Sequence, residues 1–326
     1  MNQITNLLRG VVALLLAPIM SSTADASQAS DRPSVVCTVG MVADVAGSVA
    51  GDRAVVTSLI GPGVDPHLHK PTRSDIGRLM QADLILAVGL HLEGRMDETL
   101  DRAGDSGRMV LRVGELLPKD SIIRSTGENE ADPHLWMDPR LWAKTVPAIA
   151  QALSTIDPDG AETYATNAKK IVTALESLDT WSAQRLATVP PASRVLVTAH
   201  DAFEYFGRRY GFEVVGIQGI STESEAGVRD ITRIVDLLVR RRIPAVFVES
   251  TVPPRHVQAL VAGARARGHE VVVGGELFSD AMGDSGTYEG TYPGMIDHNV
   301  TTIARALGGE APAAGRTGKL AVESAE

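Results

Sequence analysis

The 326-residue sequence predicts an α/β protein in which two lobes with parallel sheets are joined by one long rigid helix. Short apolar strands alternate with amphipathic helices in residues 34–112, and the alternation resumes in residues 194–275. The stretch between these two blocks has no strand pattern, and its apolar residues recur at helical spacing. The chain length also suits two domains of about 100–200 residues each.

The first thirty residues have the pattern of a secretory signal peptide. Arg9 precedes the apolar run VVALLLAPIM, and the segment TADA ends in the small-x-small pattern that precedes cleavage. We therefore expect a signal peptide over residues 1–26 and cleavage before Ser27. The apolar run is too short to span a bilayer, and no cysteine lies near the cleavage point to carry a lipid. These features predict an exported, periplasmic protein without a lipid anchor.

The N-terminal lobe is expected over residues 27–156. Strands are predicted within SVVCTVGMV, AVVTSLI, DLILAVG and MVLRV, whereas RSDIGRLMQA is helical by the spacing of Ile76, Leu79 and Met80. Cys37 is the only cysteine, and its apolar neighbours predict a core position. A disulfide within the chain is therefore excluded.

Residues 157–190 are expected to form the linking helix, because they lack a strand pattern and have no proline between Pro158 and Pro190. About 30 helical residues would extend roughly 45 Å, which is enough to pass along both lobes. The C-terminal lobe is expected over residues 191–308, with strands within RVLVTAH, EVVGIQG, AVFVES and EVVVGG. The small, polar tail of residues 309–326 is expected to be disordered.

The composition argues against several classes of function. The 31 Lys and Arg residues are outnumbered by 40 Asp and Glu residues, and the formal net charge of −9 disfavours nucleic acid as a partner. Aromatic residues make up 4% of the chain, which disfavours a carbohydrate site built on stacked rings. The sequence also lacks the glycine-rich nucleotide-binding patterns and the H-E-x-x-H pattern of metalloproteases.

Four polar residues follow predicted strands or the loops beyond them. His67 and His134 each stand in an Asp-Pro-His sequence, His200 ends the strand RVLVTAH, and Asp280 follows the strand EVVVGG. Ligands of open α/β sheets bind outside the carboxyl ends of the strands, so we expect these side chains at the rim between the lobes. The Asp-Pro turn is expected to stiffen each loop that presents an imidazole.

Three imidazoles and one carboxylate form a suitable ligand set for Zn²⁺ or Mn²⁺. His69 is an alternative to His67, and Glu276 and Asp284 are alternatives to Asp280. His91 is expected to serve the structure or to support the ligands. The remaining histidines lie in predicted helices or turns and are expected to be structural; they are His256, His269 and His298.

The surrounding segments resemble those of a known family. They are GVDPHLHKPTRSDIGRLMQADLILAVGLHLEGRM, DPHLWMDPRLWAKTVPAIAQAL, VLVTAHDAFEYFGRRYGFEVVGIQGISTESEAG, VFVESTVPPR and TYPGMIDHN, and they extend over nearly all of residues 35–307. The chain is similar to the zinc and manganese solute-binding receptors of ABC importers, the cluster A-I or TroA-like family. The resemblance implies that residues 157–190 correspond to the long helix of the family. It also implies a metal site formed by His67, His134, His200 and Asp280.

Two departures from the patterns of this family leave the metal open. Dedicated zinc receptors often carry a long His-rich loop, whereas PKDSIIRSTGENEADPH has no histidine before His134. Many manganese receptors have Glu in the position of His200. This combination resembles the branch whose members bind either zinc or manganese, and three nitrogen donors favour zinc.

The resemblance implies capture of an ion rather than catalysis. A monomeric receptor without an organic cofactor would bind Zn²⁺ or Mn²⁺ between its lobes with high affinity and deliver it to a membrane ABC permease. The residues leave two alternatives open. A metal-dependent hydrolase could use the same His/Asp cluster, although the long helix interrupts the strand–helix repeat of an amidohydrolase barrel. An adhesin could reuse the receptor fold.

Overall fold

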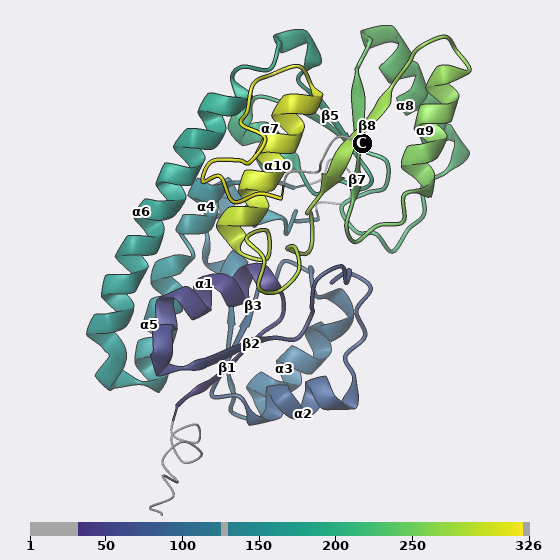
Figure 1. The fold of residues 1–326 in the computed structure, drawn as a ribbon. Helices are drawn as coiled ribbons and strands as arrows, with labels where there is room; N and C mark the ends of the chain where they lie inside the picture. Colours follow the sequence, from purple (N-terminus) through teal and green to yellow (C-terminus); the bar gives the residue numbers. More distant parts are fainter. Residues whose placement is uncertain (1–31, 125–129, 322–326) are drawn as a thin grey trace, which may run out of the picture. The chain divides into compact units, whose positions relative to one another are not determined.

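The structure is a computed structural model that describes residues 32–124 and 130–321. The signal peptide predicted for residues 1–26 lies outside the described residues. Within the described ranges, parallel strands alternate with helices and one long helix passes along both sets of strands, as Figure 1 shows. The predicted α/β class with parallel sheets and a long helix is confirmed.

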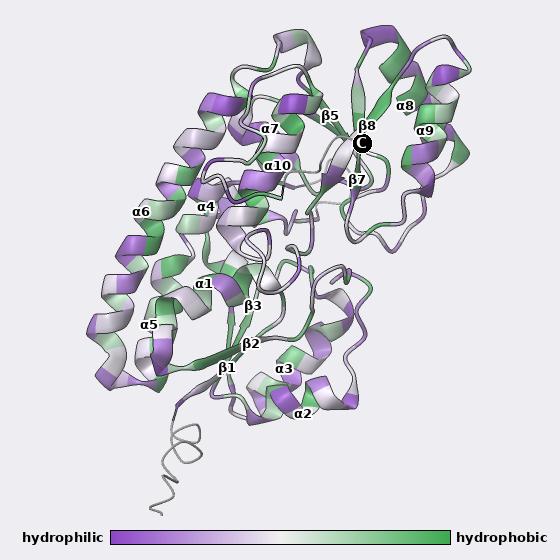
Figure 2. Ribbon diagram, viewed as in Figure 1, coloured by the Kyte–Doolittle hydropathy of each residue, from purple (hydrophilic) through white to green (hydrophobic). Residues whose placement is uncertain are grey.

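The sheet of the N-terminal lobe has four parallel strands in the order β2-β1-β3-β4. Its central register pairs Val35 with Val56 on one side and with Leu84 on the other. Every residue of β3 is buried, and Figure 2 shows the hydrophobic colouring of these strands. The strands are β1 (Ser34–Cys37), β2 (Val55–Ser58), β3 (Leu84–Ala87) and β4 (Met109–Arg112), and the helices are α1 (Gly40–Ala50), α2 (Arg73–Gln81), α3 (Asp97–Asp105), α4 (Pro139–Ala143) and α5 (Val146–Ile156).

The C-terminal lobe contains two pairs of parallel strands, β5-β6 and β7-β8, with β7 lying against β5. The strands are β5 (Val195–Thr198), β6 (Glu213–Gly216), β7 (Ala245–Glu249) and β8 (Val272–Leu277). The helices are α7 (Glu204–Tyr210), α8 (Val228–Arg241), α9 (Arg255–Arg265) and α10 (Tyr292–Ala306). Because every pair of strands is parallel, the carboxyl ends of these strands and the loops that follow them lie at one edge of each sheet.

The long helix α6 (Ala161–Leu186) lies within the predicted range of residues 157–190. Its 26 residues extend about 39 Å and pack against α1 and α5 on one side and α4 and α10 further along. Its buried side chains include Tyr164, Leu175 and Leu178. Neither α6 nor any other helix in residues 32–124 and 130–321 has the length and apolar character needed to cross a bilayer.

The C-terminal tail differs from the predicted disorder up to Ala321, and residues 322–326 lie outside the described residues. The side chain of Leu320 is buried. The backbone N–H of Arg316 donates to both carboxylate oxygens of Asp297 on α10, at 2.9 Å each. The small and polar residues of the tail predict disorder. The buried carboxylate of Asp297 instead accepts hydrogen bonds from the tail backbone and holds the tail against α10.

Candidate metal centre

Four side chains from both lobes converge in the structure. His67 lies in the loop between β2 and α2, His134 precedes α4, His200 follows β5, and Asp280 follows β8. One ligand atom from each residue lies within 4.8 Å of the others, and the four residues are between 0% and 4% exposed. The structure therefore brings together all four residues that were predicted from the sequence.

The ring nitrogens have the spacing of a tetrahedral metal site. His134 Nε2 lies 3.3 Å from His67 Nε2 and 3.4 Å from His200 Nε2. Its distance to Asp280 Oδ1 is 3.2 Å. Zinc bonds of about 2.0–2.1 Å in a regular tetrahedron give edges of about 3.3–3.4 Å. The donor atoms therefore lie where one small divalent ion would contact them all.

Asp280 turns both carboxylate oxygens toward the histidines. Its Oδ2 lies 3.2 Å from His200 Nε2 and 3.8 Å from His67 Nε2. Both oxygens are buried, and neither accepts a well-formed hydrogen bond from the described residues. A buried carboxylate without hydrogen bonds is costly unless a cation is close, and either one or two of these oxygens could bind a metal. The centre can thus offer four or five donor atoms.

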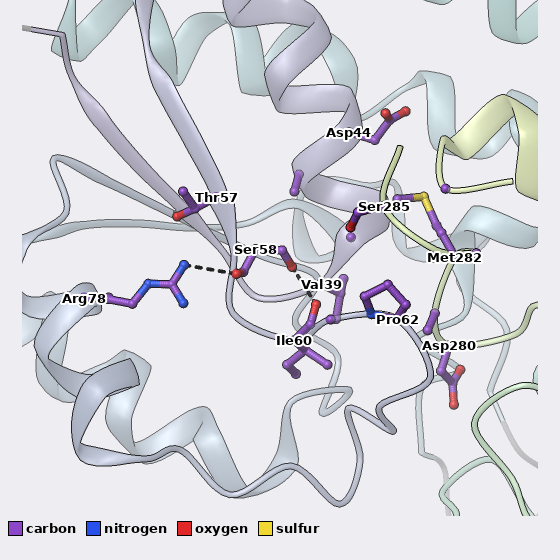
Figure 3. Close-up of a pocket in the computed structure, with 16 residues that line it drawn as sticks. Val39, Asp44, Thr57, Ser58, Ile60, Pro62, Arg78, Asp280, Met282 and Ser285 are labelled. Carbon is purple, nitrogen blue, oxygen red and sulfur yellow. Dashed lines mark hydrogen bonds between the residues drawn. The ribbon is translucent and has the colours of Figure 1, made fainter. Parts of the chain in front are cut away.

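Arg78 and Asp280 line the same pocket, but the guanidinium of Arg78 is engaged elsewhere. Arg78 Nη2 donates to the carbonyl of Ser58 at 3.1 Å, and Figure 3 shows Arg78 and Asp280 at opposite ends of the pocket. Among the described residues, the ion pairs of Asp280 are formed only with the three clustered histidines. The negative charge of Asp280 must therefore be balanced by protonated imidazoles or by a bound cation.

Two further carboxylates orient the histidine rings. Asp132 Oδ1 accepts from His134 Nδ1 at 2.7 Å, and Glu249 Oε2 lies 2.5 Å from His200 Nδ1. A carboxylate is an acceptor, so each ring carries its proton on Nδ1 and presents Nε2 to the centre. The sequence analysis did not assign these roles. The Asp-x-His spacing was a signal for Asp132, whereas Glu249 ends an apolar strand and carries no local signal.

The repeated Asp-Pro-His sequence forms the same local turn twice. Asp65 Oδ1 accepts the backbone N–H of His67 at 2.8 Å, and Asp132 Oδ1 accepts that of His134 at 2.9 Å. An aspartate that binds the backbone two residues later fixes a tight turn. In both loops the aspartate, together with the fixed φ of proline, holds the histidine at the tip.

Without a metal ion, the pKa values of the three imidazoles are shifted in different directions. Burial lowers the pKa of His67 to about 3, against the attraction of Asp280. Burial also opposes protonation of His134, but its hydrogen bond to Asp132 and the adjacent negative charge of Asp280 outweigh burial and raise its pKa to about 9. The pKa of His200 is raised despite burial because of the nearby charges of Glu249 and Asp280. Burial raises the pKa of Asp280, yet the adjacent positive charges of His200 and His134 dominate and hold this pKa well below its usual value.

The alternative ligands lie outside the cluster. His69 is half-buried with its Nε2 3.5 Å from Asp75 Oδ2, and His91 is exposed beside Asp97. Glu276 and Asp284 are exposed on either side of Asp280. The other histidines have their own neighbours: His256 lies near Glu225, His269 near the Ile243 carbonyl, and His298 near the Glu276 carbonyl.

Comparisons with known proteins point to one family. The profile of the ZnuA family, described as zinc-uptake complex component A, periplasmic, matches residues 35–306. The chain is 46% identical over 286 residues to the manganese-binding lipoprotein MntA of Bacillus subtilis (strain 168), covering 87% of this chain and 93% of that protein. It is 45% identical over 279 residues to the zinc-binding protein TroA of Treponema pallidum (strain Nichols), covering 86% and 90%.

A comparison with solved structures points to the same family. The solved structure of the periplasmic zinc-binding protein TroA from Treponema pallidum superposes with a TM-score of 0.82 at 44% identity, covering 85% of this chain and 99% of that one. The family consists of metal-binding receptors rather than enzymes, so the hydrolase alternative has no support from these relatives. The profile match over most of the chain and the two similar relatives show that the protein belongs to the ZnuA family of periplasmic zinc-uptake components.

Proposed function

We propose that this protein is the extracytoplasmic receptor of an ABC importer and captures Zn²⁺ or Mn²⁺ with high affinity. The ion would be bound by Nε2 of His67, His134 and His200 and by the carboxylate of Asp280. The two relatives described above are named for binding manganese and zinc, which supports this class of cargo. The ion would lie between an N-terminal lobe (residues 27–156) and a C-terminal lobe (residues 191–308) linked by residues 157–190.

One observation carries the proposal. The carboxylate of Asp280 is buried, lacks hydrogen-bond donors, and faces three ring nitrogens at 3.2–3.8 Å. A divalent cation at their midpoint would satisfy the carboxylate and the nitrogens together. All donors come from the protein and are buried, which suits retention of a cargo ion. A catalytic zinc would instead keep an open position for water.

The geometry leaves both metals as candidates for transport. The nitrogen spacing matches a four-coordinate zinc site, and three nitrogen donors favour zinc over manganese. The two inward-facing oxygens of Asp280 would allow a fifth bond, which suits manganese. Competition between the two ions therefore has to decide the cargo.

The test is a titration of the purified, metal-stripped protein with Zn²⁺ and Mn²⁺, alone and in competition. We expect one equivalent of metal to bind, and we expect His67→Ala to weaken binding strongly. His91→Ala is the matched control, because His91 is an exposed histidine outside the cluster. A wild-type protein that binds no stoichiometric metal, or equal affinity in the His67→Ala variant, would contradict the proposal.

We further propose that the mature receptor is a monomer in the periplasm, carries no lipid anchor, and docks on a membrane permease. The only cysteine of the sequence, Cys37, is buried within β1, and burial raises the pKa of its thiol. Cys37 lies within a strand and not at the expected cleavage point before Ser27, where a lipid would be attached. Fractionation of cells that express the chain tests this: recovery in the osmotic-shock fraction is expected, and recovery only in the membrane fraction would contradict it.

A further inference from the structure

A loop of the C-terminal lobe, residues 218–227, begins next to one predicted ligand. The backbone N–H of Gln218 donates to the carbonyl of Ala199 at 3.0 Å, and that of Asp201 donates to the carbonyl of Gly219 at 3.3 Å. These two bonds involve the residues immediately before and after His200. The side chain of Gln218 also binds the carbonyl of Ser224 at 3.0 Å, which braces the loop internally. The base of the 218–227 loop is therefore fixed to the segment that carries His200.

The middle of the same loop reaches the N-terminal lobe. Thr222 is 8% exposed, and its hydroxyl donates to Asp65 Oδ2 at 2.5 Å. The other oxygen of Asp65 holds the backbone N–H of His67. Beside this contact, Arg95 Nε donates to Glu223 Oε1 at 3.0 Å on the surface. The 218–227 loop thus connects the segment of His200 to the turn that presents His67.

The C-terminal end of the 218–227 loop is held by contacts within the C-terminal lobe. Glu225 forms ion pairs with Arg255 and His256 of α9, and Gly227 precedes α8. A loop that is anchored at both ends within one lobe can transmit the position of that lobe to the residue it contacts in the other.

His134 is attached to the C-terminal lobe in a different way. Trp136 Nε1 donates to the carbonyl of Ser279 at 2.8 Å, next to Asp280, and the Tyr205 hydroxyl donates to the carbonyl of Asp132 at 2.8 Å. Both bonds are buried, and the ring of Trp136 packs edge-on against that of His134. His134, His200 and Asp280 therefore form one connected block.

His67 lacks such support. Among the described residues, the loop 59–72 makes two polar contacts with the C-terminal lobe, Asp65–Thr222 and His67–Asp280. His67 Nε2 also lies 3.3 Å from His134 Nε2 and 3.8 Å from Asp280 Oδ2, but these contacts hold only the ring. The hydroxyl of Thr222 holds the turn itself, because Asp65 binds the backbone of His67.

We propose that Thr222 is a positioning residue that holds His67 on the metal through Asp65 and so sets the rate at which the ion leaves. The proposal rests on the proposed function as a metal receptor. Breaking the Thr222–Asp65 bond lets the turn swing away with His67, and the ion loses one of its donors. The exposed Arg95–Glu223 pair strengthens the same contact to a smaller extent, because surface ion pairs contribute little.

The experiment measures metal dissociation from the full-length mature protein by mixing the Zn²⁺-loaded form with excess chelator. Thr222→Val removes the hydroxyl and keeps the shape, Thr222→Ser keeps the hydroxyl, and Thr180→Val is the matched control on the exposed face of α6. We expect dissociation from Thr222→Val to be about two- to twelvefold faster, as for loss of one net hydrogen bond of about 0.5–1.5 kcal/mol. The wild-type rate is expected for Thr222→Ser and Thr180→Val.

A double-mutant cycle separates positioning from a general loss of stability. In the Asp65→Ala background, Thr222→Val is expected to change the dissociation rate no further. An unchanged rate in Thr222→Val, or an equal acceleration with and without Asp65, would overturn the proposal. If Thr222→Val does not fold, Glu223→Gln provides the test, with a smaller acceleration expected and an unchanged rate counting against the 218–227 loop. Absence of metal binding by the wild type would instead refute the receptor function itself.

Discussion

Glu249 Oε2 lies 2.5 Å from Nδ1 of His200, and Glu249 Oε1 accepts the backbone N–H of the same residue at 2.9 Å. One buried carboxylate at the end of β7 therefore fixes both the backbone and the ring of His200, which follows β5. The fold therefore determines that His200 carries its proton on Nδ1 and that its Nε2 points toward the metal centre.

Replacing Glu249 by Gln should weaken metal binding without removing a metal donor. The amide lacks the charge that holds the Nδ1 proton, and loss of such a partner typically costs about 10–100-fold in metal affinity. Competition with a chromophoric chelator measures the change. Glu213→Gln is the control, because Glu213 is an exposed glutamate paired with Arg241. Equal affinities of Glu249→Gln and the wild type would show that Glu249 does not support His200 as a ligand.

Asp280→Asn should abolish most of the stabilisation that metal gives to the folded protein. A ligand present at 100 times its Kd stabilises by about 2.7 kcal/mol, and an amide at this position supplies neither the charge nor the second oxygen. The measurement is the rise in Tm on adding Zn²⁺ or Mn²⁺ at one fixed concentration. Asp284→Asn, an exposed change in the same loop, should keep the rise. If Asp280→Asn keeps it too, the carboxylate does not bind the ion.

Metal binding should release protons at pH 7. The pKa of His134 is raised to about 9 and that of His200 is also raised, so both rings carry an extra proton in the metal-free protein. The pKa of His67 is lowered to about 3, so this ring is already neutral. An ion must displace one proton each from His134 and His200, and the apparent affinity should therefore rise with pH from pH 7 through the pKa of His134 near 9.

Calorimetry in buffers of different ionisation enthalpy counts the protons released. His91→Gln, outside the cluster, should leave the count unchanged. A binding enthalpy that does not depend on the buffer at pH 7 would mean that the rings are neutral before the ion arrives.

The strands and most of the candidate site could be predicted because both leave local signals. His67, His200 and Asp280 follow apolar strands directly or after a short turn, and the topology of a parallel sheet brings such positions together. Glu249 and Thr222 could not be predicted. Their roles depend on β7 lying beside β5 and on a loop reaching the other lobe, and neither relationship has a trace in the residues around them.

The end of β8 shows how packing can overrule a local signal. The sequence predicts a strand that stops at Gly275, whereas the strand continues to Leu277. A Cβ at Gly274 would lie 2.7 Å from Ala306 Cβ, and one at Gly275 would lie 2.6 Å from Thr302 Cγ2. The glycines are there because α10 packs directly on the strand, and such a close approach cannot be distinguished from a turn in the sequence alone.

Asp179→Ala should destabilise the protein, because Asp179 joins the long helix to α7. Asp179 is 3% exposed and accepts two hydrogen bonds from the Arg209 guanidinium, at 2.7 and 2.5 Å. The hydrogen bond to Asp179 raises the pKa of Arg209, which shows that the pair favours the charged form. Removing one partner of a buried pair costs about 3–5 kcal/mol, and the partial exposure of Arg209 places the loss near the lower limit.

Urea unfolding of the metal-free protein measures this loss, with Asp159→Ala as the control for an exposed aspartate before α6. Asp179→Ala should also disturb the metal centre, because α7 carries Tyr205, whose hydroxyl donates to the carbonyl of Asp132. We therefore expect Asp179→Ala to weaken metal binding modestly as well as to lower the unfolding free energy. A change in unfolding free energy below about 0.5 kcal/mol, the range of neutral surface substitutions, would show that the pair does not hold α7 against α6.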